Sequence, residues 1–177
     1  MKEIEIKNHF ENVYENLSDE IFRFIVLRVD SREDALDILQ EVFFKFWQTL
    51  EKGETVLKER GFLFKVARNK VIDWYKKKKP ASLESFFDED GEEVEVVIPD
   101  EGSYREMNLS SEAVWALEML KKIPPLHAEM IRMRFIENMT LTEIAELLSI
   151  SHNAVSLRIN RALAVFRKEL GIDLDNK

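Results

Sequence analysis

The chain has 177 residues, enough for one ordinary domain or two small ones, and no cysteine, which excludes disulfides, thiolate metal sites and a cysteine nucleophile. The apolar share of 45% is normal for a globular protein, but the net charge of −8 is an odd balance for a DNA-binding protein. The charge is unevenly distributed. Residues 61–82 carry seven Lys and Arg against one Asp, whereas residues 83–112 carry eleven Asp and Glu against one Arg.

Two amphipathic helices are predicted at the amino terminus. The first covers residues 4–29, and a change of phase in its apolar pattern predicts a break near residues 17–19. Ser31 is expected to cap the second, which runs to about Leu50. The positions left opposite its wide apolar face are Asp37, Gln40, Glu41, Phe44 and Lys45. An exposed phenylalanine among charges indicates a partner-binding surface.

A loop is predicted over residues 51–60, followed by a basic helix that ends in four lysines and is stopped by Pro80. The residues expected opposite its apolar face are Lys65, Arg68, Asn69, Ile72, Asp73 and Lys76. Basic residues interleaved with Trp74 and Tyr75 suit single-stranded nucleic acid, because cations follow the backbone and rings stack on bases. Trp74 taken alone is better explained as a core residue.

Residues 81–111 are rich in acid, Ser and Gly and are predicted to form a flexible linker. Residues 92–98 alternate as a strand would, but we identify no partner strand for them. The expected fold is therefore all-α, with two small helical domains at residues 1–80 and 112–177. The second domain should contain helices at residues 112–122 and 126–136, separated by Pro124 and Pro125.

A helix-turn-helix is predicted over residues 140–163. Thr140 and Glu143 have the spacing of a capping box, residues 149–151 form the turn, and Ser151 can cap the second helix. The polar outer side of that helix is expected to hold Asn153, Ser156, Leu157, Arg158, Asn160 and Arg161. Amides, a hydroxyl and arginines on a short second helix suit a DNA major groove. The pattern alone also fits a helical hairpin whose polar face is merely solvated.

Catalytic, metal-binding and cofactor-binding patterns are not found. There is no Gly-rich phosphate loop, metal-ligand spacing or Ser/His/Asp order, and the acidic pairs lie in the predicted linker, where nothing would hold them as acid and base. The amino terminus does not resemble a signal peptide, and no apolar run approaches a membrane span. The sequence thus predicts a cytoplasmic protein that is not an enzyme and does not insert into a membrane.

Three separated segments resemble one family in the same order. DALDILQEVFFKFW resembles the core-polymerase-binding helix of bacterial sigma factors, FLFKVARNKVIDWYKKK resembles their promoter-melting helix, and TLTEIAELLSISHNAVSLRINRAL resembles their minus-thirty-five reader. The short chain resembles the extracytoplasmic-function (group four) class. This resemblance implies sigma region 2 at residues 1–80, an acidic linker at 81–111 and sigma region 4 at 112–177.

The resemblance also implies roles for individual residues. Asp37, Gln40 and Glu41, with Phe44 beside them, match positions that grip the clamp helices of the largest polymerase subunit. The minus-ten DNA-binding set is Lys65, Arg68, Asn69, Asp73, Lys76 and Lys77, with Asn69 matching the asparagine that lines the pocket for a flipped base. The minus-thirty-five set is Arg134, Asn153, Ser156, Leu157, Asn160 and Arg161. Ser156 and Asn160 depart from residues common in relatives, so the promoter sequence cannot be copied from them.

The implied partners are core RNA polymerase, through its clamp helices and flap, promoter DNA, and an anti-sigma factor. Two other classes remain open from the residues themselves: a stand-alone helix-turn-helix regulator, and a helical adaptor that does not bind DNA. The basic helix at residues 61–79 favours the sigma factor over the first, because a reader of double-stranded DNA needs no melting helix. The arginine- and amide-bearing face at residues 153–161 favours it over the second.

Overall fold

The computed structural model describes residues 2–78, 83–87, 93–97 and 107–172, which form two compact units. The first unit contains helices α1 (Lys2–Val26), α2 (Arg32–Glu51) and α3 (Glu59–Lys78). The second contains the strands and the remaining helices. Two helical units confirm the expected all-α class. Lys79, Pro80 and much of the predicted linker lie outside the described residues.

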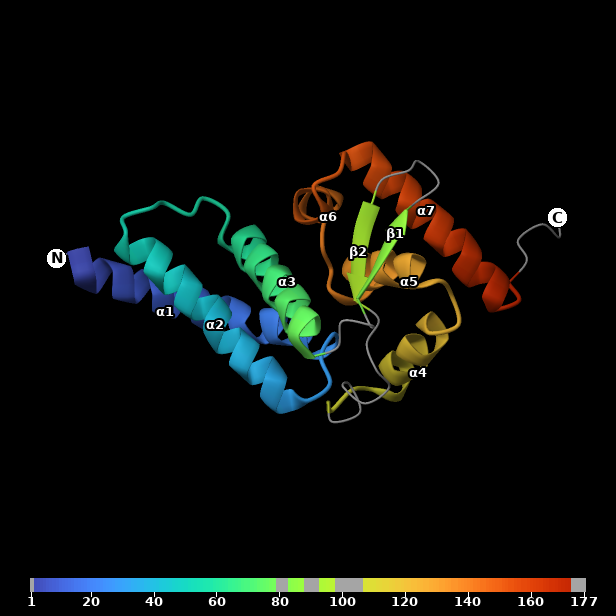
Figure 1. Cartoon of the computed structure of the whole chain (residues 1–177), viewed down its shortest axis with the longest axis horizontal. Coiled ribbons are helices and arrows are strands. Elements are labelled where there is room, and N and C mark those ends of the chain that lie inside the picture. The colour runs from blue at the N-terminus through green and yellow to red at the C-terminus, as the bar shows by residue number, and fades with distance from the viewer. Residues whose placement is uncertain (1, 79–82, 88–92, 98–106, 173–177) are drawn as a thin grey trace. The chain divides into compact units, whose positions relative to one another are not determined.

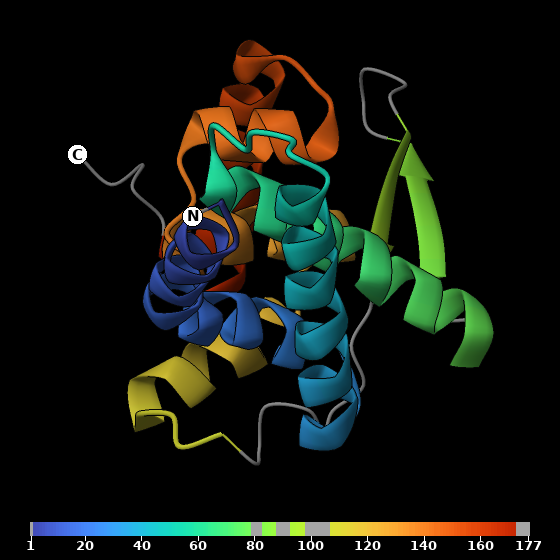
Figure 2. The same ribbon diagram turned by 90° about the vertical axis from the view of Figure 1, so that its left-hand side faces the viewer.

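The helices α1, α2 and α3 pack against one another in a three-helix arrangement (Figures 1 and 2). The predicted break in α1 is wrong, because the helix is continuous and ends at Val26 rather than at residue 29. Ile21, Phe24 and Ile25 are fully buried, whereas the earlier turns of α1 have one side open to solvent. The change of phase in the apolar pattern therefore marks a change from one-sided to nearly complete burial.

The helix α2 has the predicted cap and the predicted buried face. The Ser31 hydroxyl accepts a hydrogen bond from the Asp34 backbone N–H at 3.1 Å. The buried apolar positions are the expected Ala35, Ile38, Leu39, Val42, Phe43, Phe46 and Leu50. Aromatic rings of α1 close over this face, with Tyr14 4.7 Å from Phe43 between ring centroids. This packing fixes which side of α2 faces outward.

The second unit contains α4 (Ser111–Leu120), α5 (Pro125–Ile131), the π-helical turn η2 (Arg132–Ile136), α6 (Leu141–Leu148) and α7 (His152–Glu169). The long α7 contacts both α5 and α6. The single helix predicted over residues 126–136 is instead α5 followed by η2, where the Glu137 N–H donates to the Arg132 carbonyl at 3.0 Å. Pro125 occupies the first turn of α5, as the sequence predicts.

Two short strands, β1 (Leu83–Phe87) and β2 (Glu93–Val97), pair as a two-stranded sheet, and β2 contacts α5 (Figure 1). The expectation that the alternating segment at residues 92–98 has no partner strand is therefore wrong. The partner, LESFF, is only five residues long and lies next to the lysine run. Such a short segment carries too little alternation to be recognised in the sequence.

Three helices end in the same left-handed turn. Gly53 after α2 has φ 76° and Gly171 after α7 has φ 68°, while the equivalent residue after α6 is Ser149, with φ 57°. Ile150 donates its N–H to the Ala145 carbonyl at 3.1 Å, which is the outer bond of a Schellman motif. Glycine usually occupies this position because it has no Cβ, so Ser149 holds a strained backbone conformation.

Candidate nucleic-acid and partner interfaces

The outward side of α2 brings together the four residues predicted to bind a partner. Asp37, Gln40, Glu41 and Phe44 are all exposed, and the Phe44 ring has 62% of its surface accessible. An exposed ring of this size within a row of polar groups is a candidate protein contact. The sequence did not indicate that Glu41 also forms an ion pair with Lys70 of α3, with 2.6 Å between Oε2 and Nζ.

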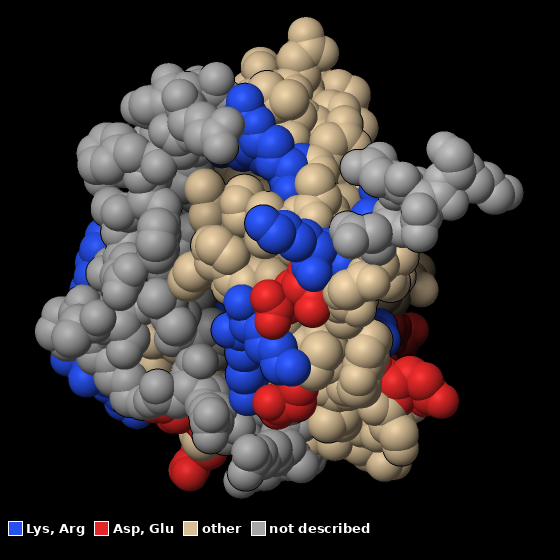
Figure 3. All heavy atoms as spheres, turned by 90° about the vertical axis from the view of Figure 1, so that its right-hand side faces the viewer, with Lys and Arg blue, Asp and Glu red and all other residues tan. Residues whose placement is uncertain are grey.

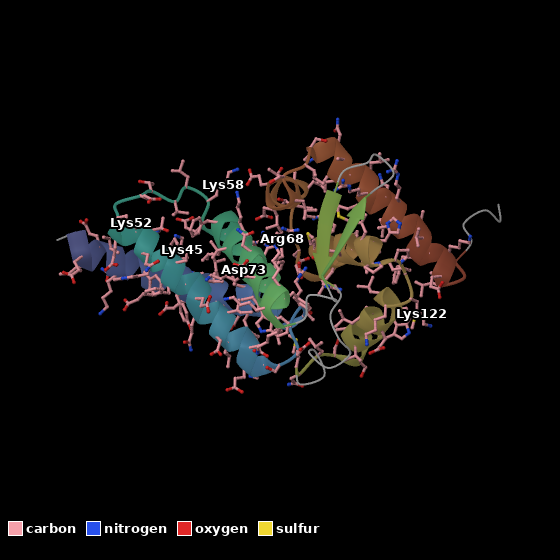
Figure 4. All side chains as sticks on the ribbon, viewed as in Figure 1. Lys45, Lys52, Lys58, Arg68, Asp73 and Lys122 are labelled. Carbon is pink, nitrogen blue, oxygen red and sulfur yellow. The ribbon has the colours of Figure 1, made fainter. Side chains whose placement is uncertain are left out.

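The helix α3 presents most of the predicted basic face. The exposed residues are Lys65, Asn69, Asp73, Lys76 and Lys77, and Arg68 is half-buried. Figure 4 labels Arg68 and Asp73 on this helix. Two expectations are wrong. Ile72 was placed among the polar positions but is buried, and Tyr75 has no exposed surface, so its ring cannot stack on a base.

Trp74 has a role that neither sequence interpretation anticipated. Its side chain is half-buried, and the indole Nε1–H donates to Asp34 Oδ1 at 3.1 Å. The Lys78 ammonium lies 5.3 Å from the indole centroid and also binds Asp34 Oδ1. Trp74 and Lys78 thus tie the carboxyl-terminal end of α3 to the amino-terminal end of α2. Asp34 and Lys78 were not among the predicted site residues.

The carboxylate of Asp34 and the ammonium of Lys78 each stabilise the ionised form of the other. Partial burial opposes ionisation of Asp34, but hydrogen bonds from Lys78, Ser31 and Trp74 outweigh it and lower the pKa of the Asp34 carboxyl below its usual value. The bond to Asp34 in turn raises the pKa of the Lys78 amine. Asp34 and Lys78 are therefore both charged throughout the neutral pH range.

The helix-turn-helix has the local hydrogen bonds that its sequence predicts. Thr140 Oγ1 accepts from the Glu143 N–H at 3.2 Å, and Glu143 Oε2 accepts from the Thr140 N–H at 2.8 Å. Ser151 caps α7 by accepting from the Ala154 N–H at 3.1 Å. These bonds satisfy amide donors at both helix starts and so fix where each helix begins.

The outer side of α7 exposes Asn153, Leu157 and Asn160, and Ser156 and Arg161 are half-buried. These five are the predicted reading positions, and they lie on one side of the helix. Arg158 was expected beside them but is only 3% exposed. Arg158 lies one turn from each of the buried residues Val155 and Ala162. It therefore shares their side of α7, which faces the core, instead of the outer side on which the periodicity placed it.

Arg134, predicted to contact DNA, is half-buried and donates from Nη1 to the Met139 carbonyl at 2.9 Å. Met139 directly precedes the cap of α6, so this guanidinium also holds the loop that leads into the helix-turn-helix. Arg132 lies inside the unit, where it pairs with Glu129 at 3.0 Å, and each side chain of this pair is only 9% exposed. Arg132 is therefore part of the core.

The face shown in Figure 3 gathers Lys and Arg side chains with Asp and Glu side chains between them. A mixed face of this kind has a weaker electrostatic field than a uniform basic patch.

Within the described residues, no group of three or more His, Asp or Glu is arranged to hold a metal ion. No helix in the described part of the chain combines the length and the apolar character that a membrane span requires.

Residues 13–80 match the sigma-70 region 2 family, and residues 119–168 match the sigma-70, region 4 family. The chain is 26% identical over 168 residues to the ECF RNA polymerase sigma factor SigW of Bacillus subtilis, a match that covers 91% of this chain and 88% of SigW. It is also 26% identical to SigX of the same organism, over 91% of this chain and 83% of SigX.

Two solved structures share the fold. CnrH, solved in complex with the cytosolic domain of CnrY, aligns with TM-score 0.62 and 21% identity over 94% of this chain and 90% of that one. The sigma factor RpoE from Bartonella quintana, in complex with the anti-sigma factor NepR, aligns with TM-score 0.62 and 18% identity, over 93% and 98%. The chain belongs to the sigma-70 family of transcription initiation factors, in its extracytoplasmic-function class.

Proposed function

We propose that the chain binds core RNA polymerase through α2, traps unpaired promoter bases against α3 and reads the upstream promoter element with α7. The observation that carries this proposal is the pair of different surfaces in one chain. An exposed polar and aromatic face on α2 adjoins a basic face on α3, and a helix-turn-helix follows. A regulator that binds only double-stranded DNA would need neither of the first two surfaces.

On α2, Phe44 supplies apolar contact area, and Asp37, Gln40 and Glu41 supply the polar groups around it. This composition suits the helical clamp of the largest polymerase subunit, where an aromatic anchor is surrounded by polar contacts. The flap of the polymerase is the second contact proposed, on the region 4 unit.

On α3, Asn69 is the residue proposed to recognise a base. Its exposed amide can both donate to and accept from a base edge, which a lysine cannot do. Lys65, Lys76 and Lys77 hold the phosphates around it without reading sequence. Moving a base out of the stack costs a few kcal/mol, roughly, and contacts to the flipped base offset this cost.

On α7, Asn153, Asn160 and Arg161 have side chains that bind base edges in the major groove, and Leu157 has the apolar surface that contacts a thymine methyl group. Arg134 donates one hydrogen bond to the Met139 carbonyl, just before the cap of α6, and is proposed to reach DNA with its other donors. An anti-sigma factor is a further proposed partner, because RpoE was solved with the anti-sigma factor NepR. The protein is proposed to be cytoplasmic and not an enzyme.

Reconstitution with purified core polymerase tests the proposal directly. Core enzyme with the chain should give discrete runoff transcripts from a library of genomic fragments, and core enzyme alone should not. A chain that binds individual fragments but gives no transcript with core enzyme would instead be a stand-alone regulator.

The α2 surface can be tested by titration against core polymerase. Gln40→Ala with Phe44→Ala should weaken binding at least tenfold, roughly the effect of losing one aromatic anchor. Leu57→Ala is the matched control, because Leu57 is 87% exposed in the loop before α3 and lies off this face. Equal affinities for the two variants would remove α2 from the polymerase contact.

The α3 surface can be tested by permanganate footprinting of unpaired thymines. Asn69→Ala should leave polymerase binding intact and slow strand opening about tenfold, the value of one hydrogen bond of roughly 1–1.5 kcal/mol. A premelted bubble should rescue it only in part, because the flipped base still lacks its partner. Asn16→Ala removes an exposed amide from α1 and should open promoters at the wild-type rate. If Asn69→Ala does so too, α3 is a phosphate-binding surface only.

A further inference from the structure

Two carboxylates of α2 and three side chains of α3 form a line of contacts, which we call the α2–α3 seam: Asp34, Glu41, Lys70, Trp74 and Lys78. The two carboxylates are seven residues apart, and the three α3 residues are each four apart, so each set lies on one side of its helix. The order is antiparallel, because the early Asp34 contacts the late Lys78 and the late Glu41 contacts the early Lys70.

In the α2–α3 seam, carboxylates of α2 neutralise two lysines of α3 that could otherwise bind phosphates. Lys70 is paired with Glu41 at 2.6 Å and Lys78 with Asp34 at 2.5 Å. Lys70 is not in the minus-ten set that the resemblance implies, and Lys78 belongs only to the lysine run predicted at the end of the helix. A carboxylate that is paired with a lysine ammonium occupies the position where a phosphate oxygen would bind. Carboxylate and phosphate oxygens are both anionic and accept hydrogen bonds with similar geometry.

Lys70 is well placed for DNA once it is released. It directly follows Asn69 in the chain, and the exposed Asp73 and Lys77 lie one and two turns further along the same side of α3. The Lys70 side chain is 36% exposed, so its ammonium can move from α2 toward solvent by rotation of its four-carbon stem. A phosphate that flanks the base beside Asn69 would lie within its reach.

The Lys70–Glu41 pair is easily exchanged. The Glu41 side chain is 58% exposed, and ion pairs this open contribute roughly 0–1 kcal/mol. Glu41 also belongs to the α2 face proposed to bind polymerase. A partner that engages Glu41 therefore removes the anion that holds Lys70, and it does so without disturbing the buried packing of α2 on α3.

We propose that Lys70 is a phosphate-binding residue of α3 that Glu41 masks in the free chain and that polymerase unmasks by binding Glu41. The inference rests on the proposed function of α2 and deepens it, because one side chain then links the two surfaces. Linkage makes the effect reciprocal: promoter phosphate bound to Lys70 also leaves Glu41 free for polymerase.

The first test uses the free full-length chain and a labelled DNA bubble duplex of arbitrary sequence. Glu41→Gln should tighten binding and steepen the salt dependence, because one added phosphate contact changes affinity about threefold more between about 50 and 200 mM salt. Glu15→Gln, an equal charge change on the exposed side of α1, measures the general effect of removing an anion. In a Lys70→Gln background, Glu41→Gln should do no more than Glu15→Gln.

The second test uses reconstituted holoenzyme with the same bubble duplex. Lys70→Gln should weaken binding by roughly threefold at low salt in holoenzyme and scarcely at all in the free chain. Lys52→Gln, an exposed cation in the turn after α2, should have equal effects in both. If Lys70→Gln also has equal effects in both, Lys70 is not unmasked and the inference is wrong. Wild-type runoff transcription in the same preparation reports separately on the proposed function.

Discussion

In the three-helix unit, two lysines of α3 are paired with carboxylates of α2, and both pairs are partly open to solvent. In the helix-turn-helix unit, the Glu129–Arg132 ion pair is buried, and the outer side of α7 from Asn153 to Asn160 exposes two amides and one apolar side chain. The proposed DNA face of the first unit therefore has a charge that depends on its partners. The proposed reading face of the second unit has a shape that is set by its core.

This difference suggests that the two units control different aspects of DNA binding: when binding occurs, and which sequence is bound. Under the proposed mechanism, the open ion pairs of the first unit are exchanged for phosphates at little cost and control when α3 binds DNA. Amides such as those proposed to read DNA on α7 can discriminate among base edges but contribute little long-range attraction. Promoter choice should then be governed by α7, and the dependence of DNA binding on polymerase should be governed by α3.

The largest expected effect comes from breaking the buried pair. Arg132→Met removes the cation that lies 3.0 Å from the buried Glu129 carboxylate and should destabilise the second unit by about 3–5 kcal/mol. Hydrogen exchange should accelerate in α5 to α7 and remain slow in α1 to α3. Arg167→Met, in the exposed last turn of α7, is the control and should change stability by less than about 0.5 kcal/mol. Similar exchange in both variants would mean that the pair contributes nothing to the unit.

The next effect concerns reading by α7. If Arg161 reaches a guanine edge, Arg161→Ala should cost about 1–3 kcal/mol and relax the preference at one base position. Competition binding of holoenzyme to a library of upstream elements measures both quantities. A uniform loss across all sequences would instead identify Arg161 as a phosphate contact, and Arg167→Ala provides the comparison for such a loss.

A smaller effect is expected at the turn between α6 and α7. Ser149→Gly should stabilise the second unit by roughly 0.5–1 kcal/mol, because glycine adopts the positive φ there without strain. Gly53→Ala at the equivalent turn after α2 should destabilise the first unit by a similar amount. An added Cβ at Gly53 meets no heavy atom within 4 Å, so this substitution isolates the backbone effect. Urea unfolding midpoints of the two variants should move in opposite directions.

The smallest effect is the pH dependence of the α2–α3 seam. The pKa of Asp34 is lowered in the folded chain, so its contribution is complete above its unfolded value near 3.8 and is lost as pH falls through the folded value. Asp34→Asn should therefore cost less than about 1 kcal/mol at neutral pH, and the difference from wild type should vanish in stronger acid. Glu33→Gln, in the same helical turn, controls for the helix dipole. A difference that persists at low pH would exclude the ionised carboxylate as its cause.

The local features of the fold were predictable because their signals lie within a few residues. The cap at Ser31 and the capping box at Thr140 each depend on neighbours in sequence. The buried face of α2 was also predictable, since its apolar residues recur at one angle. The partner-binding residues predicted on α2 lie on one exposed side, and those predicted on the outer side of α7 also share one side, except for the buried Arg158.

The misplaced residues depend on contacts between distant parts of the chain. Trp74 binds Asp34, forty residues earlier, and no periodicity within α3 indicates this. Tyr75 and Ile72 are buried because α3 packs against both α1 and α2, so its enclosed surface is wider than a single apolar stripe. Arg158 was misplaced for a similar reason, because an angle on a helix does not show how much of the helix its neighbours cover.

The pairing of Lys70 and Lys78 with carboxylates also bears on how quickly the protein finds its target. A chromosome offers roughly a million or more non-specific sites, and each exposed cation lengthens the pause at every one of them. Lysines that are already neutralised by Glu41 and Asp34 shorten these pauses. We therefore expect the free chain to spend less of its search on the chromosome and more of it in free diffusion toward polymerase.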